Sequence, residues 1–332
     1  MLENEKEIFI HIGYPKTATT TLQNNLFPNH SELNYLRKGG NNLHLIHDAF
    51  FSRENSFKKN INKYKEELLK VTQNQVKGKF VYSEESLTSF SMFFRFQPRP
   101  YIWTLEPNSI ARKLKIAFSD TDVFDCTKII VTIRKQDDMI KSMYAQVYNF
   151  VFKKFRETKT FKRFLNYSLH EVQDNFIVDS LHYDEVISEY ETLFGEDNIC
   201  VLVFEEFKKD KLAYINKLCI FMNIDEKEAL RLVENKHSNK RSSLNGYKSD
   251  ERNLLEILQY YKNKYLGNKS LGLGNSKFIE LMKSIYIPGK TLHDLDIDTA
   301  SNEKLYKLYS KGNKKLSEKY NLNLKEYGYF YE

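Results

Sequence analysis

The chain has 332 residues, of which 41% are hydrophobic and 29% charged, and its net charge of +7 comes from a lysine excess spread along the sequence. This length can bury a large core, either as one α/β domain with elaborations or as two smaller domains. The lysine excess fits solvated lysine-rich faces and, as the alternative, the attraction of an anionic ligand. Nucleic-acid binding is disfavoured because no Lys/Arg block and no Cys/His finger spacing occurs.

The N-terminal residues contain no apolar signal region, and no stretch approaches the ~20 apolar residues of a membrane span. We therefore expect a cytoplasmic protein without a membrane span. Three cysteines without CxxC spacing predict neither a disulfide framework nor a zinc site. Two of them, Cys200 and Cys219, stand in apolar segments typical of buried, inert thiols.

Apolar β-like runs alternate with helical patterns along the chain, which predicts an α/β fold with a central, mostly parallel sheet flanked by helices. The predicted strands are 7–12, 79–83, 128–133 and 199–204. The predicted helices are 19–27, 57–76, 109–118, 137–156, 180–194, 210–222, 226–235, 249–263, 277–285 and 302–319. Asp137 and Asp225 are the expected N-caps of their helices, with Glu228 as capping-box partner of Asp225.

The region after about residue 207 shows no convincing strand pattern, so we expect it to form a helical cap on the sheet. The glycines of residues 264–276 do not form a GxGxxG motif after a strand and indicate a connector. The organisation expected is a single domain over 1–332, with a core of about 7–240 and a helical C-terminal region of about 245–332.

A polar turn follows the first predicted strand. Gly13, Tyr14 and Pro15 lead into Lys16, and the next five positions are Thr17, Ala18, Thr19, Thr20 and Thr21. A strand that turns into a helix leaves backbone N–H groups free, and a lysine and hydroxyls at that point form a phosphate cradle. The alternative is an ordinary strand-to-helix turn with threonine capping.

The turn differs from the nucleotide P-loop, G-x-x-x-x-G-K-[ST]. Lys16 follows Gly13 by three residues with no second glycine before it, and the strand 128–133 ends in Arg134 where a metal-binding acid would be expected. A metal-dependent NTPase is therefore disfavoured, and no metal is expected. A cradle that places cations at the phosphates is favoured.

The segment from His11 to Thr20 resembles the 5′-phosphosulfate loop of sulfotransferases that use 3′-phosphoadenosine-5′-phosphosulfate (PAPS), which usually reads Pro-Lys-[Ser/Thr]-Gly-[Ser/Thr]-[Ser/Thr]. The chain departs at Ala18, where the family commonly has glycine, and alanine tolerates a positive φ poorly. Arg134, with Ser142 eight residues later, is similar to the family's 3′-phosphate motif. Taken alone, Arg134 also fits a surface ion pair. Residues 199–210 resemble the strand-to-helix segment that follows the 3′-phosphate helix in this family. The tail from 313 to 329 resembles the C-terminal helix and final turn of bacterial carbohydrate-type members.

The resemblance implies a P-loop-like sulfotransferase fold, PAPS as co-substrate, adenosine 3′,5′-bisphosphate (PAP) as product and no metal. It assigns Lys16 to the leaving phosphate, and Arg134 and Ser142 to the 3′-phosphate. Lys240 and Arg241, in a basic loop, either cover the nucleotide or are solvated charges. The residues implied at the 5′-phosphate are Pro15, Lys16, Thr17, Ala18, Thr19, Thr20 and Thr21.

A general base is expected because a sugar or alcohol hydroxyl is a poor nucleophile. The resemblance to carbohydrate sulfotransferases makes Glu85 the first candidate and Glu84 the second, both directly after the strand 79–83. Either carboxylate also fits a helix start. His44, with His47 three residues on, is a third candidate, or a structural residue.

The acceptor predicted is a hydroxyl-bearing glycan or glycolipid. Aromatic residues and arginines over 90–103 suit an anionic saccharide, and equally a hydrophobic lid. No oligomeric state is predicted. Two alternatives stay open: a kinase-like phosphotransferase that uses ATP and Mg²⁺, and a non-catalytic nucleotide- or glycan-binding module.

Overall fold

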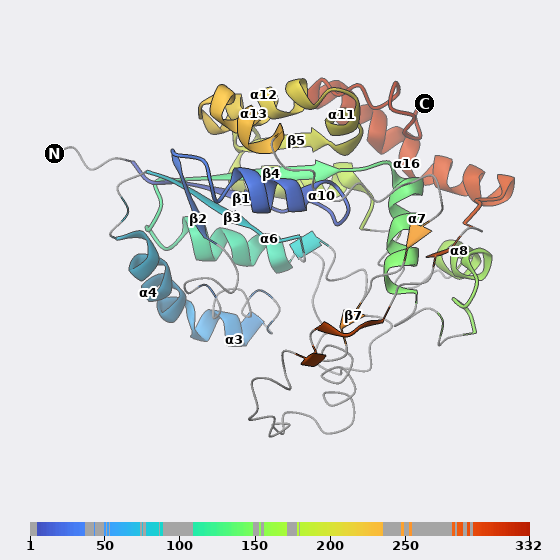
Figure 1. Cartoon of the computed structure of the whole chain (residues 1–332), viewed down its shortest axis with the longest axis horizontal. Coiled ribbons are helices and arrows are strands. Elements are labelled where there is room, and N and C mark those ends of the chain that lie inside the picture. The colour runs from blue at the N-terminus through green and yellow to red at the C-terminus, as the bar shows by residue number, and fades with distance from the viewer. Residues whose placement is uncertain are drawn as a thin grey trace.

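The computed structural model shows a central sheet with helices on both sides (Figure 1). The residues it describes are 5–36, 43, 50, 52, 54–73, 75, 78–85, 87–88, 109–148, 153, 156–170, 178, 180–234, 247–248, 252–253, 281–282, 284–287, 291–292 and 295–332.

The central sheet has five parallel strands in the order β2-β3-β1-β4-β5 within the described residues. This confirms the predicted fold class. The strands are β1 (Glu7–His11), β2 (Leu33–Leu36), β3 (Lys79–Ser83), β4 (Cys126–Ile133) and β5 (Ile199–Val203). The four predicted strands are all present, and β2 at the sheet edge was not predicted.

Helices cover both faces of the sheet. Those of the first half are α1 (Thr19–Thr21), α3 (Glu54–Lys59), α4 (Ile61–Thr72), α6 (Ser109–Leu114), α7 (Gln136–Val147) and α8 (Phe161–His170), with π-helical turns η1 (Leu22–Leu26) and η2 (Lys115–Ser119). Those of the second half are α10 (Tyr183–Phe194), η4 (Glu196–Asn198, a 3₁₀ turn), α11 (Phe204–Lys209), α12 (Lys211–Met222), α13 (Glu226–Glu234) and α16 (Thr299–Tyr320).

Several predicted helices differ in extent. The one predicted over 57–76 is two helices that meet at Asn60, and the one predicted over 137–156 ends at Val147. The helices α8 and α11 were not predicted. Residue 204 opens α11, whereas the prediction made it the end of a strand.

Of the two predicted N-caps, Asp225 is confirmed and Asp137 is not. Helix α7 begins at Gln136 with Lys135 as N-cap, so the prediction of Asp137 is wrong. Asp225 does accept from the N–H of Glu228 at 2.6 Å. Glu228 does not complete the capping box. Its carboxylate accepts from Ser31, and the N–H of Asp225 donates to Glu32.

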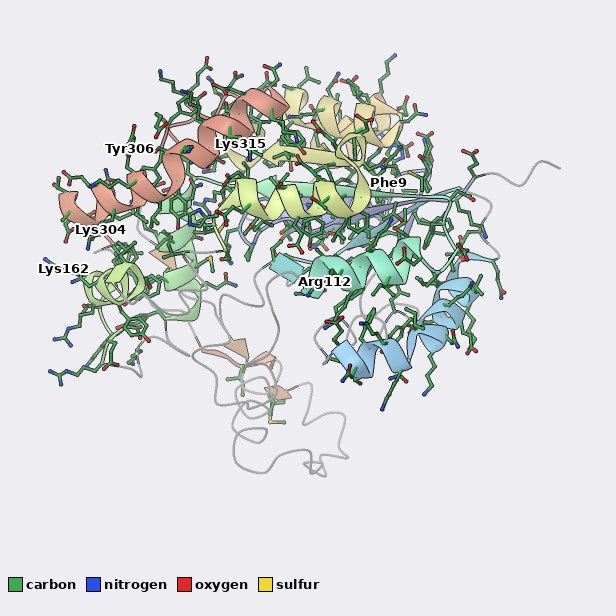
Figure 2. All side chains as sticks on the ribbon, turned by 180° about the vertical axis from the view of Figure 1, so that it is seen from behind. Phe9, Arg112, Lys162, Lys304, Tyr306 and Lys315 are labelled. Atoms are coloured by element: carbon green, nitrogen blue, oxygen red, sulfur yellow. The ribbon has the colours of Figure 1, made fainter. Side chains whose placement is uncertain are left out.

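Each sheet face has its own core. One contains Ile8, Ile10 and Val131 with side chains of α4, α6, α7, α10 and α16. The other contains Phe9 and Ile130 with side chains of η1, α12 and α13. Figure 2 shows α10 on the first face, between α16, which carries Lys315, and α6, which carries Arg112.

The C-terminal region contains short strands that the sequence did not predict. The strand β6 (Tyr247–Lys248) pairs antiparallel with β9 (Thr291–Leu292), and β7 (Arg252–Asn253) pairs with β8 (Tyr286–Ile287). The helix predicted over 249–263 is therefore wrong at residues 252–253, and most of it lies outside the described residues. The helix predicted over 302–319 is confirmed within α16.

All three cysteines are free. Cys200 and Cys219 are buried, and desolvation raises the pKa of each thiol to about 12. Both are therefore protonated near neutral pH, as predicted for inert thiols. Among the helices that the structure describes, none is long and apolar enough to cross a membrane.

Candidate active site

The site lies at the carboxyl ends of β1, β3 and β4. From β1 the chain first builds β2 and β3 on one side and then β4 and β5 on the other. The strand order therefore reverses between β1 and β4, and ligands of open α/β sheets bind in the crevice outside such a point. The turn at 13–21 follows β1, and Arg134 follows β4, so the fold brings the two predicted phosphate motifs together.

The turn after β1 is held in a strained, compact conformation. The N–H of Tyr14 donates to the carbonyl oxygen of Thr132 at 3.0 Å, which fixes the turn to the end of β4. Lys16 and Ala18 both have left-handed backbones, with φ of 65° and 63°. Turns of this kind direct successive N–H groups into a concave anion-binding nest. The glycine common at position 18 in the family thus matches a backbone that favours glycine.

Gly13 is required by close packing. A Cβ atom there would lie 2.7 Å from Nε2 of His11 and 2.9 Å from Cγ2 of Thr19, closer than real Cβ contacts. His11 is fully buried, and its ring contacts Oγ of Ser83 at 2.7 Å and Oγ1 of Thr132 at 3.2 Å. Burial lowers the pKa of His11 to about 3, so a neutral imidazole links β1 to both neighbouring strands beneath the turn.

The threonines of the turn have different partners. The Thr17 hydroxyl is buried and donates to the carbonyl oxygen of Tyr14 at 2.5 Å. Thr19 donates to Oε2 of Glu85 at 2.8 Å. Thr20 is exposed and Thr21 is buried. In this structure the hydroxyls of Thr17 and Thr19 thus fix the turn and link it to the end of β3.

The two glutamates after β3 lie beside the turn. The N–H of Glu84 donates to the carbonyl oxygen of His11 at 3.0 Å, which continues the pairing of β3 with β1. Both side chains are half-buried. Thr88 donates to the carbonyl oxygens of Gly13 at 3.3 Å and Glu85 at 3.0 Å. The first candidate base is therefore held against the candidate phosphate loop.

Arg134 connects the two phosphate motifs. Its Nη1 donates to the carbonyl oxygen of Lys16 at 3.2 Å. Its Nε is buried and has no hydrogen-bond partner among the described residues. Its guanidinium carbon lies 5.0 Å from the ring centroid of Phe204, within cation–π range. A buried donor of this kind calls for an acceptor such as a phosphate oxygen.

Lys208 is a further cation near Arg134 that sequence reasoning did not select. Its Nζ lies 4.4 Å from the centroid of the same Phe204 ring. Burial, and then the charge of Arg134, lower the pKa of Lys208. Two cations around one ring suit an anionic ligand. The signal in the sequence was the Lys208–Lys209 pair after β5, which reads equally as a solvated charge run.

The other predicted residues fall in three groups. Ser142 lies in α7 and is partly exposed. Pro15 is buried within the turn. His44, Lys240 and Arg241 lie outside the described residues. Within the described part of the chain, no group of three or more His, Cys, Asp or Glu residues could hold a metal ion.

Comparison with known proteins identifies the family. The model of the sulfotransferase domain family matches residues 6–259. The solved sulfotransferase from Alicyclobacillus acidocaldarius is 15% identical, with a TM-score of 0.44, covering 79% of this chain and 96% of that one. Mouse sulfotransferase SULT7A1, complexed with PAP, is 14% identical, with a TM-score of 0.42, covering 97% and 89%. The sulfotransferase domain of the Synechococcus PCC 7002 olefin synthase is 15% identical, with a TM-score of 0.40, covering 84% and 94%.

No curated protein matches the sequence. The family is shown by the sulfotransferase domain model. That model spans well over half of the chain. The chain therefore belongs to the sulfotransferase family, with an α/β fold built on a five-stranded parallel sheet.

Proposed function

We propose that this enzyme transfers the sulfuryl group of PAPS to an acceptor hydroxyl, with the 5′-phosphate in the turn at 13–21 and the 3′-phosphate at Arg134. The observation that carries the proposal is the double role of Arg134. Its Nη1 contacts the turn at Lys16, while its buried Nε lacks a partner among the described residues. The turn at 13–21 and Arg134 lie side by side, which matches a ligand with phosphates on two positions of one ribose. Ser142 completes the 3′ side.

Lys16 is the proposed electrophilic catalyst. Sulfuryl transfer from PAPS places negative charge on the bridging oxygen of the departing phosphate. An ammonium group on a fixed turn stabilises that charge as it develops. The left-handed backbones of Lys16 and Ala18 fix the shape of the turn, and a fixed turn needs little reorganisation during the reaction.

Glu85 is the proposed general base. The Thr19 hydroxyl donates to Oε2 of Glu85 at 2.8 Å, which holds the carboxylate beside the turn, and as the base it would take the proton of the acceptor hydroxyl. Glu84 is the second candidate and His44 the third. Glu85 is preferred because its carboxylate contacts the turn where the transferred group would lie.

The acceptor proposed is a glycan or glycolipid, by the resemblance of the sequence to bacterial carbohydrate-type members. Residues 90–103, which would contact a saccharide, lie outside the described residues. The nucleotide-covering role of Lys240 and Arg241, the cytoplasmic location, the single-domain organisation and the lack of a metal requirement stay predictions.

The test of the function is sulfuryl transfer from labelled PAPS by Lys16→Ala. We expect a loss of roughly 100- to 1000-fold in kcat, the usual effect of removing one transition-state stabiliser. Lys70→Ala, an exposed lysine of α4, is the matched control and should keep full activity. Full activity of Lys16→Ala would refute the assigned role.

Ligand binding separates the alternatives. Strong thermal stabilisation by ATP and Mg²⁺ without any by PAP would favour the kinase-like phosphotransferase. A binding module would be stabilised by PAP yet show neither transfer to an acceptor panel nor slow hydrolysis of PAPS.

A further inference from the structure

The turn that carries Arg134 is joined to the C-terminal part of the chain at its third residue. Gln136 is buried, and its Nε2 donates to Oδ1 of Asn313 in α16 at 2.7 Å. The Asn313 amide donates back to Oε1 of Gln136 at 3.2 Å and to the carbonyl oxygen of Phe330 at 2.9 Å. This buried amide pair fixes the start of α7 against α16 and the tail that follows it.

The backbone of Lys135, the second residue of the turn, is hydrogen-bonded to a carboxylate that also accepts from the C-terminal tail. The N–H of Lys135 donates to Oε1 of Glu205 at 3.3 Å. The hydroxyl of Tyr329 donates to Oε2 of the same carboxylate at 2.8 Å. Gly328, with φ of 76°, forms the bend before Tyr329, and a Cβ there would lie 3.7 Å from Nζ of Lys135. The tail thus passes directly along the turn.

Arg134 itself is held from the same side. Its carbonyl oxygen accepts the Tyr183 hydroxyl at 2.6 Å. The ring under its guanidinium is Phe204, the residue before Glu205 at the start of α11. Every residue of the turn at 134–136 is therefore hydrogen-bonded to a later element.

We propose that Glu205 and Tyr329 are positioning residues for Arg134: together with Asn313 they form a brace that holds its guanidinium in place for the 3′-phosphate. The inference rests on the proposed function of Arg134. The contact of the carboxylate is with the Lys135 N–H, so the brace acts through the backbone of the turn. Asn313 and Tyr329 lie beyond residue 259, where the family match ends.

Tyr329 is the cleanest residue to test. It is buried, and desolvation followed by the charge of Glu205 raises the pKa of Tyr329 far above its usual value, so the hydroxyl stays a neutral donor. Replacing Tyr329 by phenylalanine removes one hydrogen bond without changing any charge near Arg134. A substitution of Glu205 changes the charge near both Arg134 and Lys208, and this charge change alone affects anion binding.

The experiment compares two nucleotides that differ only in the 3′-phosphate, PAP and adenosine 5′-phosphate, as inhibitors of the intact enzyme. For Tyr329→Phe we expect PAP to bind roughly 5- to 10-fold more weakly, as for the loss of one hydrogen bond. Adenosine 5′-phosphate should change less than 2-fold. In this variant the KM for PAPS should rise in parallel with the inhibition constant of PAP, while kcat at saturating PAPS stays within about 2-fold. Tyr331→Phe, the same change two residues on at a partly exposed ring, should alter neither nucleotide.

A matched pair at Glu205 gives a second test at constant charge. Glu205→Gln keeps an oxygen for the Lys135 N–H and a polar group for Tyr329, whereas Glu205→Ala removes both. PAP should bind more weakly to the alanine variant than to the glutamine variant, with adenosine 5′-phosphate equal in both. This pair decides the matter if Tyr329→Phe fails to fold, which its thermal unfolding will show.

Arg134→Ala separates failure of the brace from failure of the function. If Arg134→Ala weakens both nucleotides equally, the 3′-phosphate is not at Arg134, and the proposed site and the brace both fall. If Arg134→Ala selectively weakens PAP, the site stands. The brace is then overturned if Tyr329→Phe weakens both nucleotides equally, weakens neither, or adds its full effect to that of Arg134→Ala in the double variant.

Discussion

Ala18→Gly should stabilise this enzyme, although glycine usually destabilises a fold. Ala18 has a left-handed backbone with φ of 63°, and this conformation costs a residue with a Cβ roughly 1–2 kcal/mol. Glycine adopts it freely but loses about 0.5–1 kcal/mol more entropy on folding. At the midpoints of the two ranges the difference is a gain of about 0.75 kcal/mol in the free energy of unfolding.

The assay is thermal unfolding followed by circular dichroism. A gain of this size raises Tm by roughly 1–3 °C in a chain of 332 residues, since the shift per kcal/mol falls with size. Ala213→Gly is the matched control, because Ala213 is exposed in the first turn of α12. There the same substitution should lower stability by roughly 0.5–1 kcal/mol.

The two variants must therefore differ in the sign of their effect. If Ala18→Gly lowers Tm as Ala213→Gly does, the turn does not hold residue 18 in the left-handed region. The physical explanation offered for the family's glycine would then be wrong as well.

Two further predictions concern buried groups. Lys113 is buried in α6, where its ammonium donates to the carbonyl oxygens of Phe50 and Ser52, and desolvation lowers its pKa to about 8. An unfolded lysine titrates near ~10.4, so above about pH 8 the unfolded state binds more protons. The free energy of unfolding should rise from about pH 8 to 9.5, by up to ~1.4 kcal/mol per pH unit. In urea denaturation, Lys113→Met should lack that rise. The same pH dependence in both proteins would contradict the lowered pKa of Lys113. Gly13→Ala should weaken PAP binding at least about 10-fold in calorimetry, because the Cβ would press on His11 and Thr19. Unchanged binding would argue against the close packing of that turn.

The sequence predicted most of the sheet because the central strands are locally distinctive. Residues 129–133 and 199–203 are nearly all apolar, as expected where helices cover both faces. The edge strand β2 escaped prediction because Leu33–Leu36 is only four residues long and includes the polar Asn34. Its pairing with β3 depends on contacts about 45 residues apart, which no local pattern reveals.

In the candidate site, too, local motifs were predictable from the sequence and distant contacts were not. The turn at 13–21 and the arginine at 134 were visible because each motif is contiguous in sequence. The roles of Glu205 and Tyr329 were not, since Glu205 contacts the turn from 70 positions away and Tyr329 contacts Glu205 from 124 positions away. Sequence reasoning also missed that α7 begins at Gln136, because Asp137 is the better capping residue but Gln136 is fixed by Asn313.

The amide pair of Gln136 and Asn313 joins positions 177 residues apart, and this separation bears on the order of folding. Contacts so distant close a large loop, and the loss of chain entropy makes them late events. The arginine turn therefore reaches its final geometry only when α16 docks. Because a ligand stabilises only states that bind it, a 3′-phosphorylated nucleotide would select molecules in which α16 has docked.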